Sequence, residues 1–191
     1  MNVIFACGGT GGHINPAIAV ANIWKERHPD SKILFIGAKG HMEEKLVPQA
    51  GYELKCLPGA GLARGKSMKA IKKNVQVVRD LLGSIKECKR IIREFKADVV
   101  VGTGGYASFP ALKMGAKLGI PTAVHESNAV PGLTTKMVAG VVDRILVSFA
   151  DSRAHYDRPE KVTVVGTPVR EDFLYTDKMT ARRELGLDDR L

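Results

Sequence analysis

The chain has 191 residues, of which 45% are hydrophobic and 26% are charged, and its formal net charge is +9. These values are those of an ordinary soluble globular protein, and the length suits one large domain or a domain with an extension. No run reaches the roughly 18 apolar residues of a membrane span, and the first residues lack the basic and long apolar regions of a signal peptide.

The cysteines predict a reducing compartment. Cys7, Cys56 and Cys88 form no C-x-x-C pair, and three thiols cannot all pair with each other. We therefore expect reduced thiols in the cytosol and no structural zinc.

The chain opens with an expected strand over residues 2–7, which runs into the turn Gly8-Gly9-Thr10-Gly11-Gly12-His13. Glycines allow positive φ and a close approach of the backbone to a ligand. A helix is expected over residues 16–28, with Asn15 as N-cap and Pro16 at its first position, and its positive dipole end would point back at the turn. We predict that the turn binds an anion and that His13 acts as a base or binds a sugar or phosphate.

Two well-known glycine loops do not fit this turn. A dinucleotide fingerprint needs a third glycine where Ile14 stands, and an acidic residue where the second strand ends in Gly37-Ala38-Lys39. A P-loop needs a lysine after its last glycine, and none follows Gly12. Neither NAD binding nor ATP hydrolysis is therefore predicted, and the alternative to a site role for His13 is simple packing at a helix start.

The chain then alternates apolar stretches typical of buried parallel strands with stretches of helical periodicity. Further strands are expected over residues 32–37, 53–57, 98–102, 121–125, 143–148 and 161–166, and further helices over residues 42–50, 110–118, 133–139 and 180–187. This alternation predicts an α/β fold with a Rossmann-like, doubly wound parallel sheet of about seven strands.

Positive charge is concentrated between Pro58 and Lys96, where eleven basic residues stand against three acidic ones. A glycine loop over residues 58–65 leads into a basic amphipathic helical segment over residues 68–95, in which Gly83-Ser84 is a candidate break. Such a stripe usually packs on a core with a solvated outer face; the alternative is contact with an anionic membrane or a phosphate-bearing substrate. The residues expected at a membrane are Leu62, Arg64, Lys66, Lys69, Lys72 and Lys73. Only Phe95 offers an aromatic ring there, so nucleic acid is not an expected partner.

A second glycine loop and a polar strand end extend the candidate site. Gly102-Thr103-Gly104-Gly105-Tyr106 follows the fourth expected strand, and His125-Glu126-Ser127-Asn128 closes the fifth. Ligands of open α/β sheets bind along the carboxyl ends of the strands. We therefore expect these segments and His13 to converge, although each residue taken singly is compatible with a helix cap or a loop.

With these motifs, the sequence resembles the N-terminal half of the MurG family, peripheral membrane N-acetylglucosaminyltransferases that convert lipid I to lipid II in bacterial cell-wall synthesis. The resemblance covers essentially the whole chain. It rests on the first glycine turn with Pro16, on Gly104-Gly105-Tyr106, on His125-Glu126-Ser127-Asn128, on Gly132-Leu133-Thr134 and on Gly166-Thr167-Pro168-Val169-Arg170. It implies the N-terminal half of a GT-B fold, with a domain over residues 1–166 and, over residues 167–191, a linker and the start of a donor domain that this chain lacks.

The resemblance also implies chemistry and partners. The activity would be inverting transfer from UDP-N-acetylglucosamine to a lipid-linked muramyl-pentapeptide acceptor, with no metal or other cofactor. It would take place at the cytoplasmic face of the inner membrane, on an anionic surface, and the chain alone would be inactive. The implied donor residues are Thr10, Gly11, Gly12, Asn128 and Arg170, and the implied acceptor or diphosphate residues are Gly104, Gly105, Tyr106, His125 and Thr134. His13 is our first choice as general base and Glu126 our second, while Ser127 and Thr135 stand where the family commonly has Gln and Asn.

Two alternatives stay open. Another GT-B enzyme of UDP-sugars, such as an epimerase or a macrolide-type glycosyltransferase, would share the glycine loops but not the His125-Glu126-Ser127-Asn128 motif together with the basic helix. A non-catalytic module that binds anions or membranes through the basic segment is the alternative outside enzymes.

Overall fold

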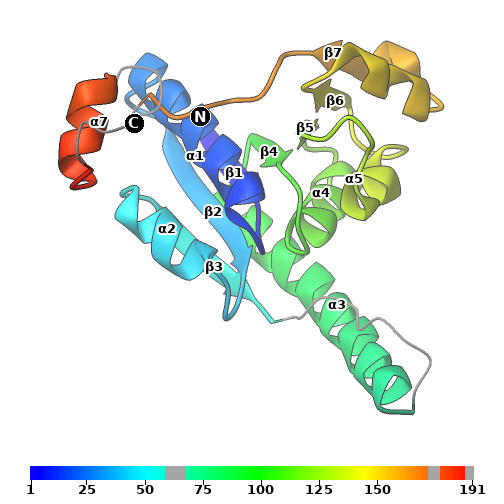
Figure 1. Ribbon diagram of the computed structural model, residues 1–191. Coiled ribbons are helices and arrows are strands. Elements are labelled where there is room, and N and C mark those ends of the chain that lie inside the picture. Colours follow the sequence, from blue (N-terminus) through cyan, green and yellow to red (C-terminus); the bar gives the residue numbers. More distant parts are fainter. Residues whose placement is uncertain (59–67, 172–176, 188–191) are drawn as a thin grey trace.

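The computed structural model describes residues 1–58, 68–171 and 177–187, and for residues 68–78 it describes the backbone alone. Within these ranges, a seven-stranded parallel sheet has the order β3-β2-β1-β4-β5-β6-β7 (Figure 1). The strands are β1 (Asn2–Ala6), β2 (Lys32–Ala38), β3 (Glu53–Leu57), β4 (Val99–Gly102), β5 (Thr122–Glu126), β6 (Arg144–Val147) and β7 (Val162–Val164). The order reverses between β1 and β4, as in doubly wound folds, and confirms the predicted Rossmann-like sheet.

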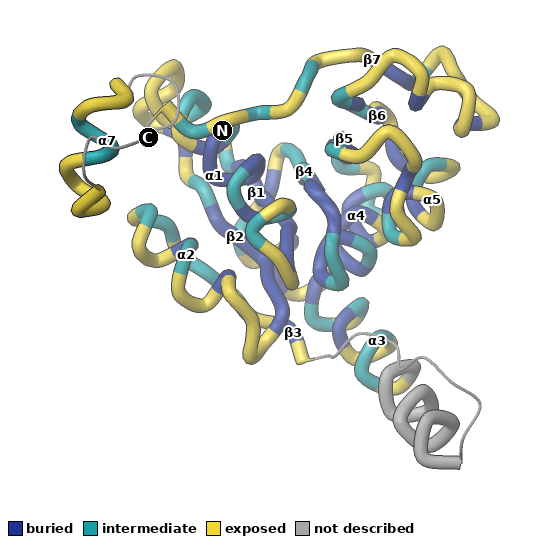
Figure 2. The backbone as a smooth tube through the Cα atoms, viewed as in Figure 1, coloured by how far each residue is buried: buried dark blue, intermediate teal, exposed yellow. Residues whose placement is uncertain are grey.

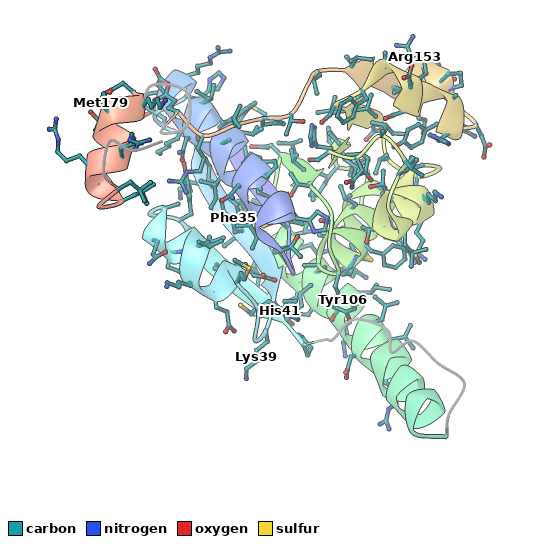
Figure 3. The ribbon with its side chains drawn as sticks, viewed as in Figure 1. Phe35, Lys39, His41, Tyr106, Arg153 and Met179 are labelled. Atoms are coloured by element: carbon teal, nitrogen blue, oxygen red, sulfur yellow. The ribbon has the colours of Figure 1, made fainter. Side chains whose placement is uncertain are left out.

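Helices cover both faces of the sheet. They are α1 (Gly11–Arg27), α2 (Glu43–Gln49), α3 (Met68–Phe95), α4 (Ser108–Lys117), α5 (Leu133–Val138) and α7 (Lys178–Glu184), with short 3-10 helices η1 (Ala150–His155) and η2 (Pro159–Lys161) that the sequence did not predict. Because side chains alternate along a strand, Val3 and Phe5 pack with α1 and α2, whereas Ile4 and Ala6 pack with α3 and α4. Strands β1 and β2 are mostly buried between these layers, whereas β3 at the edge of the sheet is largely exposed (Figure 2). Phe35 lies at the middle of β2 (Figure 3).

Helix α1 begins at Gly11, so the predicted start at Pro16 with Asn15 as N-cap is wrong. Thr10 occupies the N-cap position with an extended backbone, and Pro16 lies inside the helix. Proline lacks an N–H, so the hydrogen bond to the Gly12 carbonyl is missing and the ring crowds that carbonyl, although the fixed φ of proline is compatible with a helix. As a result His13 lies in the first turn of α1, and its own N–H donates to the carbonyl oxygen of the N-cap residue Thr10 at 3.0 Å. The N–H groups of Gly11 and Gly12, which precede it, have no acceptor in the i→i−4 pattern of the helix.

Helix α3 runs without interruption through Gly83 and Ser84, so the candidate break does not occur. Ser84 is buried, and its hydroxyl donates to the Pro58 carbonyl oxygen at 2.7 Å. This bond attaches α3 to the end of β3.

The side chains predicted to contact a membrane are not among those that the structure describes. Leu62, Arg64 and Lys66 lie outside the described residues, and so do the side chains of Lys69, Lys72 and Lys73. No helix in the described part of the chain is long and apolar enough to cross a membrane.

Candidate functional site

Two glycine loops meet at the carboxyl ends of β1 and β4. A Cβ atom on Gly105 would overlap the Gly8 carbonyl group, and one on Gly104 would come within 2.6 Å of His13 Cδ2. Gly104 and Gly105 also have φ values of 108° and 80°, which L-residues rarely adopt. Only glycine at both positions allows the two loops to pack this closely.

Hydroxyl groups hold the second loop in place. Thr103 Oγ1 donates to the His13 carbonyl oxygen at 2.6 Å, and Thr134 Oγ1 donates to the Gly105 carbonyl oxygen at 3.1 Å. Ser108 is fully buried, and its Oγ lies 2.6 Å from the Ala6 carbonyl oxygen and 3.1 Å from the Gly104 nitrogen, which donates to it. Thr103 and Ser108 were not among the predicted site residues, since serine and threonine beside a glycine loop are too common to stand out.

His13 has one ring nitrogen occupied and one available. Its Nδ1 lies 3.0 Å from the Gly8 carbonyl oxygen. A carbonyl oxygen can only accept, so in the neutral ring Nδ1 carries the proton and Nε2 keeps its lone pair. The half-buried imidazole lies against Gly104, at the junction of the two loops. This geometry allows Nε2 to take a proton from a bound hydroxyl group.

Glu43, at the start of α2, is a buried carboxylate behind the first glycine loop, and the sequence did not predict its role. Its Oε1 accepts from the Ala38 nitrogen at 2.8 Å and its Oε2 from the Gly9 nitrogen at 3.1 Å. A Cβ atom on Gly37 would come within 2.5 Å of Glu43 Cγ. The one available signal was therefore Gly37, because a glycine inside a strand often marks a close approach.

Glu126 is almost fully buried and is saturated with hydrogen bonds. It accepts from Asn128 N at 3.0 Å, Asn128 Nδ2 at 2.7 Å, Gly132 N at 2.9 Å and Thr135 Oγ1 at 2.6 Å. Burial by itself would raise the pKa of Glu126, but these hydrogen bonds outweigh it and the pKa lies below its ordinary value. A carboxylate so stabilised is a weak base, and its contacts hold the loop between β5 and α5.

His125 is 3% exposed and has both ring nitrogens within reach of partners. Its Nε2 lies 3.0 Å from the Gly166 carbonyl oxygen and therefore donates, while its Nδ1 lies 3.4 Å from Ser127 Oγ. Burial lowers the pKa of His125, which favours the neutral ring. His125 thus attaches the end of β5 to the turn that follows β7.

Tyr106 follows the second glycine loop, and Arg170 follows the turn after β7. The Tyr106 hydroxyl is 3.3 Å from Ser84 Oγ, so this side chain points toward α3 (Figure 3). Arg170 is half-buried and follows Pro168 and Val169, which line a hollow together with Trp24 of α1. The structure brings His13 together with Gly104, Gly105 and Thr134, and it joins Glu126 to Asn128.

Across the described residues, no three His, Cys, Asp or Glu side chains form a group that could hold a metal ion. The three cysteines are free thiols, with Cys7 and Cys88 buried and Cys56 exposed.

The strand order and the interlocked glycine loops define a Rossmann-like, doubly wound α/β domain with its two glycine loops at the carboxyl ends of neighbouring strands. The family can be stated more closely, because residues 3–147 match the glycosyltransferase family 28 N-terminal domain. The chain belongs to this family.

Relatives of known name are similar along the whole chain. The UDP-N-acetylglucosamine–N-acetylmuramyl-(pentapeptide) pyrophosphoryl-undecaprenol N-acetylglucosamine transferase of Alkaliphilus oremlandii is 44% identical over 191 residues, which are 100% of this chain and 51% of that protein. The protein of the same name from Acetivibrio thermocellus is 40% identical over 187 residues, covering 98% of this chain and 50% of the relative. The chain therefore spans about half the length of these relatives.

Solved structures show the same fold. Acinetobacter baumannii MurG superposes with a TM-score of 0.71 at 24% identity, over 93% of this chain and 50% of that one. The UDP-GlcNAc 2-epimerase of Neisseria meningitidis, bound to UDP-GlcNAc, gives a TM-score of 0.64 at 16% identity, over 97% of this chain and 50% of that one. At these identities the likeness extends to the fold alone.

Proposed function

We propose that this chain is the acceptor-side half of an inverting glycosyltransferase. The full enzyme would move N-acetylglucosamine from UDP-N-acetylglucosamine to a lipid-linked muramyl-pentapeptide pyrophosphate and so form lipid II. The observation that carries this proposal is His13, which lies at the junction of two glycine loops with its Nδ1 bound to the Gly8 carbonyl group. The names of relatives 40–44% identical supply the substrates.

In the proposed reaction, His13 Nε2 takes the proton from the acceptor hydroxyl group as its oxygen attacks the anomeric carbon of the donor sugar. The bond between that carbon and the diphosphate oxygen breaks, the diphosphate leaves with the electron pair, and the anomeric centre inverts. The Gly11 and Gly12 amides in the first turn of α1, together with the helix dipole, would stabilise the negative charge of a diphosphate. This stabilisation would work without a metal ion.

The remaining site residues have proposed roles around this centre. We propose that Thr10, Asn128 and Arg170 contact the donor, and that Gly104, Gly105, Tyr106, His125 and Thr134 shape the acceptor side. Glu126 remains the second choice as base, but its four hydrogen bonds favour a role in positioning Asn128. Residues 1–166 would form the acceptor domain, and residues 167–191 would lead toward a donor domain.

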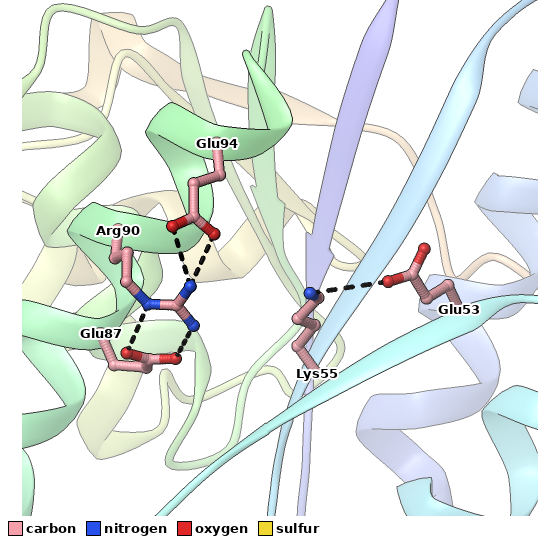
Figure 4. Close-up of polar contacts among 5 residues, drawn as sticks. All are labelled: Glu53, Lys55, Glu87, Arg90 and Glu94. Atoms are coloured by element: carbon pink, nitrogen blue, oxygen red, sulfur yellow. Dashed lines mark hydrogen bonds and ion pairs between the residues drawn. The ribbon is translucent and has the colours of Figure 1, made fainter.

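We also propose that the full enzyme binds the anionic cytoplasmic face of the inner membrane through α3. Lys86, Lys89 and Arg93 are exposed there. Arg90 is paired with Glu87 at 2.5 Å and with Glu94 at 2.6 Å (Figure 4), so it adds little free positive charge. Clustered lysine and arginine side chains attract anionic headgroups, and the acceptor itself would be lipid-linked.

The test joins this chain to the C-terminal half of the Alkaliphilus oremlandii relative and supplies labelled UDP-N-acetylglucosamine with a lipid-linked acceptor. We expect labelled disaccharide-lipid from the joined protein and none from the 191 residues alone. Conversion of UDP-N-acetylglucosamine to its 2-epimer, without transfer, would favour the epimerase alternative. Turnover by the 191 residues alone would contradict the proposal that they are half of an enzyme.

A further inference from the structure

Glu43 is a buried acid that the proposed reaction does not use. Its residue is 0% exposed, and its carboxylate accepts hydrogen bonds from the Gly9 and Ala38 amides. A Cβ atom on Gly8 would come within 2.6 Å of Glu43 Oε1, so the glycine loop is shaped around this side chain. Burying a carboxylate is unfavourable unless its hydrogen bonds compensate, which makes a purely space-filling role a poor explanation.

The bond to Gly9 connects Glu43 to His13 through a single peptide group. The Gly9 nitrogen and the Gly8 carbonyl belong to the same peptide unit. Its N–H donates to Glu43 Oε2 at 3.1 Å, and its carbonyl oxygen accepts from His13 Nδ1 at 3.0 Å. A carboxylate at the N–H end polarises the peptide and strengthens the acceptor at its other end, because hydrogen bonds in a chain reinforce each other.

We propose that Glu43 is the positioning residue of His13. Through the Gly8–Gly9 peptide it fixes the orientation of the imidazole, keeps the proton on Nδ1 and leaves the lone pair on Nε2. The inference about the tautomer depends only on the hydrogen bonds described above. The expected effect of Glu43 on turnover deepens the proposed function and rests on that proposed function.

A structural alternative is that Glu43 only fastens α2 to the end of β2. The bond from Ala38 serves that purpose, but the bond from Gly9 reaches into the loop. Glutamine separates the two possibilities, because it has nearly the same volume but only one acceptor oxygen. In Glu43→Gln the side-chain NH₂ must face one of the two backbone N–H groups, and the longer bond, to Gly9, is the one we expect to break.

The first experiment measures the His13 tautomer by nitrogen-15 NMR of the 191-residue chain in mildly alkaline buffer. In the parent protein we expect the proton on Nδ1, and in Glu43→Gln we expect the Nδ1-H to Nε2-H ratio to fall at least about threefold. Glu44→Gln, a change at the exposed neighbouring residue, is the matched control and should leave the ratio unaltered. A parent protein with the proton on Nε2 would overturn the proposal, even if Glu43→Gln did not fold. So would a folded Glu43→Gln with the parent ratio.

The second experiment is a double-mutant cycle in the joined, two-domain protein. Glu43→Gln should lower kcat by about tenfold or more, with the KM for UDP-N-acetylglucosamine changed by less than about twofold. In a His13→Ala background the same substitution should have almost no further effect, because Glu43 acts through His13. An equal loss in both backgrounds would show that Glu43 supports only the fold. If the joined protein transfers no sugar at all, the proposed function fails, whereas the NMR result still decides the role of Glu43.

Discussion

The imidazole of His13 lies against the backbone of Gly104, so closely that a Cβ atom on Gly104 would come within 2.6 Å of His13 Cδ2. The two residues are far apart in sequence but follow the neighbouring strands β1 and β4. The second glycine loop therefore limits where the imidazole of His13, at the exit of the first loop, can lie. Because a general base must be within hydrogen-bond reach of the proton it takes, this contact makes the second loop part of the catalytic geometry we propose.

The contact predicts that Gly104→Ala will impair transfer in the joined protein. The new methyl group would push the imidazole aside, and we expect kcat to fall by about 10². Gly119→Ala is the matched control, because Gly119 also has a positive φ but no atom within 4 Å of the position of its Cβ. Both variants carry a backbone strain of about 1 kcal/mol or more, so only the difference between them reports on His13. Equal activity in the two variants would show that the contact with His13 is unimportant.

A second prediction concerns His13 itself. His13→Ala should lower kcat by roughly 10² or more, as expected when a general base is lost. Because the side chain is only half-buried, we expect the variant to stay folded, with a melting temperature close to that of the parent. Near-normal turnover would move the base role to Glu126, which should then be replaced in the same assay.

A third prediction is that Glu126 contributes mainly to stability, and does so in a pH-dependent way. Glu126→Gln keeps the shape of the side chain but leaves some of the donors around it without an acceptor. We expect a loss of about 2–3 kcal/mol in the free energy of unfolding at neutral pH, measured by urea denaturation.

The sign of the pH effect follows from the lowered pKa of Glu126. A carboxyl group with a lower pKa in the folded state stabilises the fold above its ordinary pKa of about 4.3, and this stabilisation is lost as the pH falls through the folded value. The parent should therefore lose more stability than Glu126→Gln on acidification below about pH 4. Glu160→Gln, which removes an exposed carboxylate, is the control. Parallel curves for parent and Glu126→Gln would contradict the prediction.

The sequence was sufficient for the sheet, since continuous apolar strands and helical periodicity are local patterns. It was misleading at α1, where Asn15 and Pro16 look like a helix start but the glycines before them already take helical dihedrals. For the candidate site, glycine spacing and polar strand ends predicted that His13 and the second loop lie together, and the structure places them in contact. The carboxylate behind the first loop was missed, because an acidic residue in the first turn of a helix, such as Glu43, is usually exposed, and the glycine inside β2, Gly37, signals a close approach without saying which residue makes it.

The last prediction concerns membrane binding, and it follows from the charge excess between Pro58 and Lys96. Each lysine or arginine near an anionic surface adds on the order of 1 kcal/mol to binding. Replacing Lys69, Lys72 and Lys73 together with Gln should weaken binding to anionic vesicles by about 2–3 kcal/mol in a flotation assay. The difference from the parent should shrink as salt shortens the Debye length, and neutral vesicles should show little change.

A control variant with the same loss of charge distinguishes binding through the basic segment from a general attraction by the net charge of the protein. Lys32, Lys136 and Lys178 are exposed, belong to β2, α5 and α7, and when replaced with Gln lower the net charge by the same amount. If the basic segment contacts the membrane, this dispersed variant should bind almost as tightly as the parent, because charges more than a Debye length from the surface are screened. Equal weakening in the two variants would mean that net charge alone drives the attraction. Parent-like binding of the clustered variant at low salt would exclude these three lysines from the contact, and the membrane surface would then have to lie elsewhere on the domain.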